Sequence, residues 1–157
     1  MTKMLASLFA VALIGASAPA FAGECPADKV GTNPLTGAAT MPKGVTDMLL
    51  ASVDLGPEIN VQGRSLRTRK LVIQPGGIVP LHSHVDRPAL IMTASGTMTE
   101  YRSSCLVPIV HHAGDIAHES GGISHWWKNT GKKVAIVYSS DVHNDMPSSD
   151  MHKEMGM

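Results

Sequence analysis

The feature that most constrains the fold is a series of short apolar stretches separated by glycine and proline turns. The chain of 157 residues holds 15 Gly and 10 Pro. From Thr46 onward these residues interrupt the apolar pattern before a helix of ordinary length can form. The stretches that we expect to form strands are Met48 to Leu55, Leu66 to Gln74, Ala89 to Ala94, Thr97 to Arg102, Leu106 to His111 and Lys133 to Ser140. The pattern predicts an all-β barrel or jelly roll without helices.

Charge and composition limit the classes of partner. Lysine and arginine total 13, aspartate and glutamate total 13, and the formal net charge is +0. Nucleic acid is therefore not an expected partner, because its binding depends on an excess of basic residues. With 43% hydrophobic and 17% charged residues, the chain has the composition of one globular domain.

The N-terminal segment has the pattern of an export signal. Lys3 precedes an uncharged apolar run from Met4 to Ala18, and Ala20-Phe21-Ala22 forms a small-x-small cleavage site. The alternative, a transmembrane anchor, is disfavoured because the run is shorter than a bilayer span of about 20 residues. The mature protein is expected to begin near Gly23, in the periplasm or outside the cell, without membrane attachment. The expected segments are a signal peptide (1–22), an N-terminal arm (23–45), a barrel (46–140) and a short flexible tail rich in Met and His (141–157).

The two cysteines, Cys25 and Cys105, are candidates for a disulfide. Export into an oxidising compartment allows the bond, and two cysteines allow one pairing. Such a bond would tie the N-terminal arm to the barrel and contribute about 2 to 4 kcal/mol. The alternative is a pair of free thiols, because sequence does not show whether the two sulfurs approach each other.

A histidine pair, His82 and His84, marks the chemistry of the chain. Side chains alternate between the two faces of a strand, so both imidazoles would lie on the same face and could hold one ion. Imidazole suits iron, manganese, copper, zinc or nickel better than calcium or magnesium. The pair therefore predicts a site for one transition-metal ion of undetermined identity.

The spacing around this pair resembles the two motifs of the cupin superfamily. The residues that match are Gly76, His82, His84 and Gly96 in the first motif and Gly114, Gly122, His125 and Asn129 in the second. Ser120 replaces the proline of the second motif. The resemblance covers roughly residues 46–140 and implies a cupin double-stranded β-helix, a jelly-roll barrel that holds a metal on His82, His84 and His125.

The first motif departs from the cupin pattern at its glutamate, because Ala89 stands at that position. Three interpretations stay open. The three histidines form the whole protein ligand set, with the remaining positions open to water, substrate or dioxygen. A nearby donor substitutes for the glutamate, and the candidates are Asp86, Glu100 and His118. The barrel has lost its metal, and the histidines are hydrogen-bonded interior groups.

Arg87 and Trp127 are candidates for contact with a small-molecule ligand. Arg87 follows the histidine pair, and its guanidinium could bind a carboxylate or phosphate; the alternative is a solvated arginine. Trp127 shares the inward direction of His125 and could form a pocket wall or fill the core. In the tail, histidine and methionine donors suit copper, although short polar C-termini are usually without function.

Two functions are compatible with these features. The first is a metal-dependent oxygenase or isomerase that acts on a small molecule in the barrel. The alternative is a non-catalytic periplasmic protein that binds copper or a small ligand. Cupins include both classes, so the fold does not decide whether the protein is an enzyme. A homodimer is compatible with the sequence.

Overall fold

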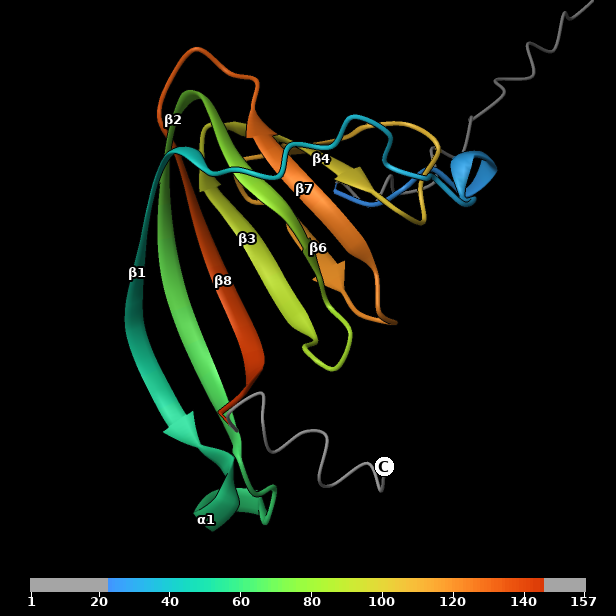
Figure 1. Cartoon of the computed structure of the whole chain (residues 1–157). Coiled ribbons are helices and arrows are strands. Elements are labelled where there is room, and N and C mark those ends of the chain that lie inside the picture. The colour runs from blue at the N-terminus through green and yellow to red at the C-terminus, as the bar shows by residue number, and fades with distance from the viewer. Residues whose placement is uncertain (1–22, 146–157) are drawn as a thin grey trace, which may run out of the picture.

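The computed structural model describes residues 23–145 and confirms an all-β barrel (Figure 1). The elements, in chain order, are a 3-10 helix η1 (Ala27–Lys29), β1 (Lys43–Asp54), α1 (Leu55–Ile59), β2 (Arg64–Ser83), β3 (Ala89–Ser95), β4 (Thr97–Arg102), β5 (Ile109–His112), β6 (Ile116–Glu119), β7 (Ser124–Asn129) and β8 (Ala135–Asn144). The eight strands form one antiparallel sheet that curls into a nearly closed barrel. The described strands begin and end slightly outside the expected barrel limits of 46 and 140.

The long strand β2 organises the barrel, because it pairs with β1, β7 and β8. Its first half, residues 64–73, lies between β1 and β8, and residues 78–83 pair with β7. The strand order is β5-β4-β7-β2-β8-β3-β6, with β1 added beside β2. One continuous strand therefore contributes side chains to both ends of the barrel interior.

The prediction that no helix follows Thr46 is wrong at one place in the described residues. Residues 55–59 form the short helix α1 instead of extending the preceding strand. The Asp54 carboxylate accepts a hydrogen bond from the Gly56 backbone N–H at 2.9 Å and caps the first turn. Asn60 ends the helix in the left-handed conformation, with a φ of 59°. These local capping contacts favour the helix over a continuation of the strand.

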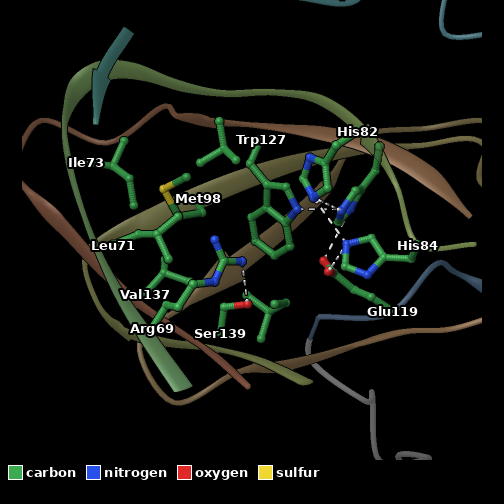
Figure 2. Close-up of a pocket in the computed structure, with 13 residues that line it drawn as sticks. Arg69, Leu71, Ile73, His82, His84, Met98, Glu119, Trp127, Val137 and Ser139 are labelled. Carbon is green, nitrogen blue, oxygen red and sulfur yellow. Dashed lines mark hydrogen bonds and ion pairs between the residues drawn. The ribbon is translucent and has the colours of Figure 1, made fainter. Parts of the chain in front are cut away.

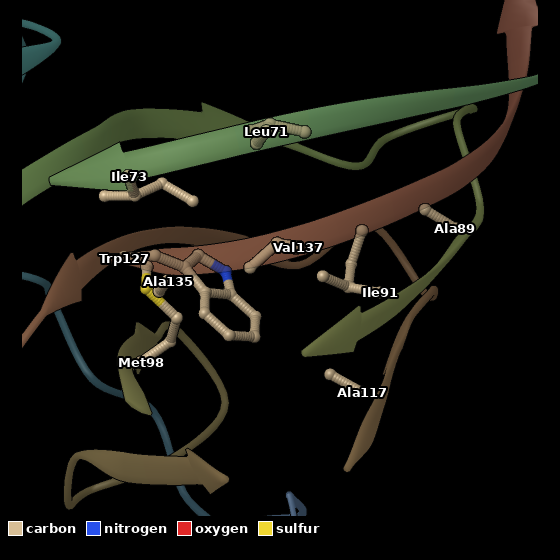
Figure 3. Packing of buried hydrophobic residues seen from close by; sticks show 9 residues of the cluster. All are labelled: Leu71, Ile73, Ala89, Ile91, Met98, Ala117, Trp127, Ala135 and Val137. Carbon is tan, nitrogen blue, oxygen red and sulfur yellow. The ribbon is translucent and has the colours of Figure 1, made fainter. Parts of the chain in front are cut away.

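The core of the barrel is built from alternate, inward-facing residues of the strands (Figure 3). Its buried members are Leu71, Ile73, Ala89, Ile91, Met98, Ala117, Trp127, Ala135 and Val137. Each large side chain contributes about 1.5 to 3 kcal/mol when it is fully removed from water. The motif glycine Gly96 has a φ of 82°, and a Cβ atom there would lie 2.8 Å from the Ala135 Cα. Any other residue would thus be strained and crowded at this turn.

A disulfide between Cys25 and Cys105 attaches the N-terminal arm to the barrel, as the sequence predicts. The two sulfurs lie 2.01 Å apart, across 80 residues of sequence. Beside the bond, Val30 and Cys105 form an isolated β-bridge. The arm is therefore fixed against the loop that follows β4.

Candidate metal centre

Three β-strands bring four potential metal ligands together inside the barrel. His82 lies near the end of β2, and His84 follows one residue beyond the strand. His82 pairs in register with His125 of β7, so their side chains share one face of the sheet. Glu119, the last residue of β6, completes the group. The ligand atoms of the four residues all lie within 4.8 Å of one another.

The histidine rings point their Nε2 atoms at one another. The Nε2 of His82 lies 3.1 Å from the Nε2 of His84 and 3.1 Å from the Nε2 of His125. On the open side, the Nε2 of His84 lies 2.8 Å from the Glu119 Oε2. Figure 2 shows His82, His84 and Glu119 around this point, at the edge of a cavity. The structure thus brings together His82, His84 and His125, the three histidines that the sequence analysis identified as candidate ligands.

Backbone carbonyls fix which nitrogen of His82 and His84 carries the proton. The Nδ1 of His82 lies 2.8 Å from the Pro80 carbonyl oxygen, and the Nδ1 of His84 lies 2.8 Å from the Arg87 carbonyl oxygen. A carbonyl oxygen only accepts, so each Nδ1 must donate. In the neutral rings the Nε2 atoms then carry free lone pairs that face each other. Such lone pairs repel unless a cation or proton lies between them.

Burial keeps the His82 ring neutral. Loss of solvation, followed by the positive charge that His125 would carry, lowers the pKa of His82 to about 4. The Pro80 carbonyl opposes this shift but does not outweigh it. At neutral pH the ring therefore offers a lone pair instead of a proton, which is the state that binds a metal ion.

A buried carboxylate network holds His125 from behind. Glu100 accepts hydrogen bonds from the His125 Nδ1 at 2.7 Å, from the His111 Nε2 at 3.1 Å and from two Arg102 nitrogens at 2.7 and 2.9 Å. The Trp127 indole N–H, which can only donate, lies 3.0 Å from the same Nδ1. Because the Nδ1 donates its own proton to the ionised carboxylate, it has no lone pair left for the indole. Burial would raise the pKa of Glu100, but the hydrogen bonds from His111, His125 and Arg102 outweigh it and hold the pKa far below its usual range.

Glu119 differs from Glu100 because one of its oxygens has no hydrogen bond. Its side chain is 1% exposed, and Oε1 has no hydrogen-bond partner among the described residues. The His125 Nδ1 lies 3.2 Å from Oε1, but its proton goes to the closer Glu100 oxygen. The other oxygen, Oε2, faces the lone pair of the His84 Nε2 at 2.8 Å, and a metal ion bound by both atoms would offset their repulsion. Three neutral imidazoles and one carboxylate are a donor set typical of transition-metal sites, so the residues fit a single ion of this class.

Glu119 lies directly across the β3–β6 pair from Ala89, where the cupin pattern has its glutamate. Opposite residues of an antiparallel pair project to the same face, so Glu119 presents a carboxylate to the region that a side chain at position 89 would reach. Sequence analysis did not single out Glu119. The only signal available was its place in the second motif, six residues before His125.

The three substitute ligands considered from sequence lie elsewhere. Glu100 accepts a hydrogen bond from the His125 Nδ1, on the side of the ring away from the Nε2 atoms. Asp86 forms an exposed ion pair with Arg64, and the exposed His118 lies 2.8 Å from Glu24. None of the three belongs to the cluster of ligand atoms.

The two candidate ligand-binding residues have different positions. Arg87 does not line the cavity beside the metal ligands; its Nη1 lies 3.4 Å from the Asp141 Oδ2. Trp127 does line the cavity and is 3% exposed, so it also belongs to the core. The volume of this cavity is about 40 Å³. Its wall holds the metal ligands, a set of apolar side chains and two polar residues, Arg69 and Ser139, neither of which the sequence analysis identified (Figure 2).

The fold and the site together define a class: a small antiparallel barrel with a histidine and carboxylate cluster inside it. Residues 69–141 match the family model of the cupin domain. These residues therefore form a cupin domain.

Comparisons with individual proteins agree with this assignment. The chain is 31% identical over 94 residues to germin-like protein 5-1 of Oryza sativa subsp. japonica, an alignment that covers 57% of this chain and 40% of that protein. The cupin domain of Cnp3 from Schizosaccharomyces pombe is similar in fold, with a TM-score of 0.53 and 11% identity over 82% of this chain and 81% of that chain. The TT1209 protein of Thermus thermophilus has a TM-score of 0.52 and 12% identity over 73% of this chain and 90% of that chain.

Proposed function

We propose that the protein binds one transition-metal ion through His82, His84, His125 and Glu119, and that it is a metal-dependent oxygenase or isomerase. The observation that carries this proposal is the set of inward-facing Nε2 lone pairs, with the Glu119 Oε2 2.8 Å from the Nε2 of His84. The adjoining cavity supports a catalytic role, because a small molecule bound there would touch both the metal ligands and Trp127.

The residues of the chain would orient the ion and shield it. When bound, the ion supplies a Lewis acid, and a redox-active metal adds a site for dioxygen. Glu100 holds the His125 ring through its Nδ1, and two backbone carbonyls do the same for His82 and His84. These outer contacts raise the basicity of the rings and fix their direction. The apolar cavity wall around Trp127 limits the access of water.

Elemental analysis of the purified protein and its variants tests this proposal. We expect about one equivalent of metal in the natural protein. Replacing Glu119 with Gln should weaken metal binding at least about 100-fold, because changes in outer-shell partners alone cost about 10- to 100-fold. His118→Ala is the matched control, because His118 is exposed and lies outside the cluster. Equal metal content in the natural protein, Glu119→Gln and His125→Ala would contradict the site.

The same analysis addresses the alternative of a copper carrier. That hypothesis depends on the Met- and His-rich tail, and residues 146–157 lie outside the described part of the chain. Copper in excess of one equivalent, lost on deletion of residues 146–157, would favour the carrier. One equivalent of metal that survives the deletion would favour the enzyme.

We also propose that the protein is exported. The signal pattern of residues 1–22 lies outside the described residues, and the Cys25–Cys105 disulfide supports an oxidising compartment. No helix in residues 23–145 has the length and apolar character to cross a bilayer. Fractionation of cells that express the full chain should recover a shortened, disulfide-bonded protein outside the cytoplasm. Recovery of the full-length, reduced chain from the cytoplasm would contradict export.

A further inference from the structure

Arg69 is a cationic side chain on the wall of an otherwise largely apolar cavity. It lies on β2 and pairs in register with Ser139 of β8, so both side chains face the barrel interior. Figure 2 shows the two residues in contact on the cavity wall, which also holds Trp127 and the metal ligands. A charged group in such a place needs a partner, because its loss of hydration is costly.

The hydrogen bonds of Arg69 leave part of its guanidinium unused. Its Nη1 donates to Asp47 at 2.6 Å, and its Nη2 makes a long contact of 3.3 Å with the Ser139 hydroxyl. The Nη2 also lies 3.8 Å from the Asp141 carboxylate. The buried Nε has no hydrogen-bond partner among the described residues. Nε and Nη2 form one edge of the guanidinium, the edge that binds a carboxylate through two hydrogen bonds.

The carboxylates nearest to Arg69 are shared with other arginines. Arg67, Arg69 and Arg87 all face the buried Asp141, and Arg67 takes both of its oxygens, at 2.7 and 3.0 Å. Three guanidinium groups thus share the carboxylates of Asp141 and Asp47. Arg67 therefore engages Asp141 most closely, and the one short ion pair of Arg69 is the one to Asp47.

The cavity also limits the size of the ligand. Its volume of about 40 Å³ corresponds to roughly three water molecules at about 10 to 15 Å³ each. A ligand of a few heavy atoms fits this space, and a large aromatic compound does not. We propose that Arg69 and Ser139 bind the carboxylate of a short-chain carboxylic acid, whose other end faces the metal ligands. This inference rests on the proposed function and names the substrate class of the same site.

Glycolate and its neutral analogue glycolamide test the proposal on the zinc-loaded full chain. Both molecules carry a hydroxyl oxygen and have similar size, but only glycolate has a carboxylate. By isothermal titration calorimetry, the natural protein should bind glycolate at least about tenfold more tightly than glycolamide, because a hydrogen bond to a charged group is worth about this much. Arg69→Gln should lose this preference and keep its equivalent of zinc.

Arg67→Gln is the matched control. It removes the same charge from the same Asp141 cluster, but Arg67 does not line the cavity. We expect this variant to keep the preference for glycolate. An unchanged preference in zinc-loaded Arg69→Gln would overturn the inference, because the carboxylate would then bind through the metal alone. If Arg69→Gln does not fold, Arg69→Lys decides: a preference reduced by at least about threefold supports the two-bond contact, and an unchanged preference overturns it.

Failure of the metal site can be told apart from failure of this inference. If the natural protein binds neither zinc nor another transition-metal ion, the proposed function is contradicted, and the same titrations are made on the metal-free protein. A preference for glycolate that disappears in Arg69→Gln would still support the carboxylate site. No preference for glycolate in the natural protein, with or without zinc, would overturn it.

Discussion

The two sides of His125 differ in how they treat a buried carboxylate. Behind the ring, Glu100 accepts hydrogen bonds from Arg102, His111 and His125, and both of its oxygens are occupied. On the cavity side, Glu119 is equally buried but has one oxygen without a hydrogen bond. A buried carboxylate with hydrogen bonds to both oxygens stabilises its surroundings, whereas one that lacks a hydrogen bond is free to bind a ligand. Burial alone therefore does not distinguish a structural carboxylate from a metal ligand, and the number of hydrogen-bond partners does.

The largest expected difference between the two carboxylates is in folding stability. Glu100→Gln should lower the free energy of unfolding of the metal-free protein by about 3 to 5 kcal/mol, because it leaves the Arg102 guanidinium buried without its counter-charge. Glu119→Gln should change it by less than about 1 kcal/mol, because within residues 23–145 the ion pairs of Glu119 are with His84 and His125 and none is with an arginine. Guanidinium chloride unfolding of both variants measures the difference. Equal losses would show that Glu119 is also a structural carboxylate.

A second prediction concerns the position of the carboxylate rather than its presence. Glu119→Ala should lose at least about 100-fold in metal affinity, and the double variant Ala89→Glu with Glu119→Ala should regain most of it. The two positions lie opposite each other in the β3–β6 pair, so a glutamate at either position can reach the same region. Competition with a chelator measures the affinities. A double variant as weak as Glu119→Ala would show that the two positions are not equivalent.

Ala89→Glu alone is the informative control for this exchange. It would place a second carboxylate beside Glu119, and two close carboxylates repel each other when both are ionised. We therefore expect little gain in affinity from the single variant, although the cupin pattern by itself suggests that restoring the glutamate strengthens binding. A large gain would contradict the view that Glu119 already serves as the carboxylate ligand.

The smallest effect is the dependence of stability on pH. The pKa of Glu100 is far below its usual value of 4.5 in the folded protein, so the unfolded chain binds more protons as the solution is acidified. The contribution of Glu100 to the free energy of unfolding is fully present well above pH 4.5. It decreases as the pH is lowered through 4.5, by at most about 1.4 kcal/mol per pH unit. Glu100→Gln should lack this contribution to the acid dependence. Unfolding curves of the natural protein and Glu100→Gln at pH 5, 4 and 3 measure this contribution. The same change in the free energy of unfolding with pH in both proteins would contradict the prediction.

Local sequence patterns determined much of the architecture. Apolar stretches between turn residues predict the all-β barrel, and the spacing of His82 and His84 places both rings on one face. Two cysteines allow one disulfide pairing, which the structure contains. The helix α1 was missed because its first turn is capped by the Asp54 side chain, next to the end of the expected strand. The resemblance to cupins added His125. Each of these features depends on neighbours in the sequence or on a motif that the sequence displays.

Only the tertiary structure decided the fourth ligand, the support of His125 and the polar cavity wall. Glu119 meets the histidines because β6 pairs with β3, and Glu100 reaches His125 because β4 pairs with β7. Arg69 faces the cavity because of the register between β2 and β8. Alternation along a strand is set by local backbone geometry, so it can be read from the sequence. Register between distant strands results from the packing of the whole barrel, and no short segment encodes it.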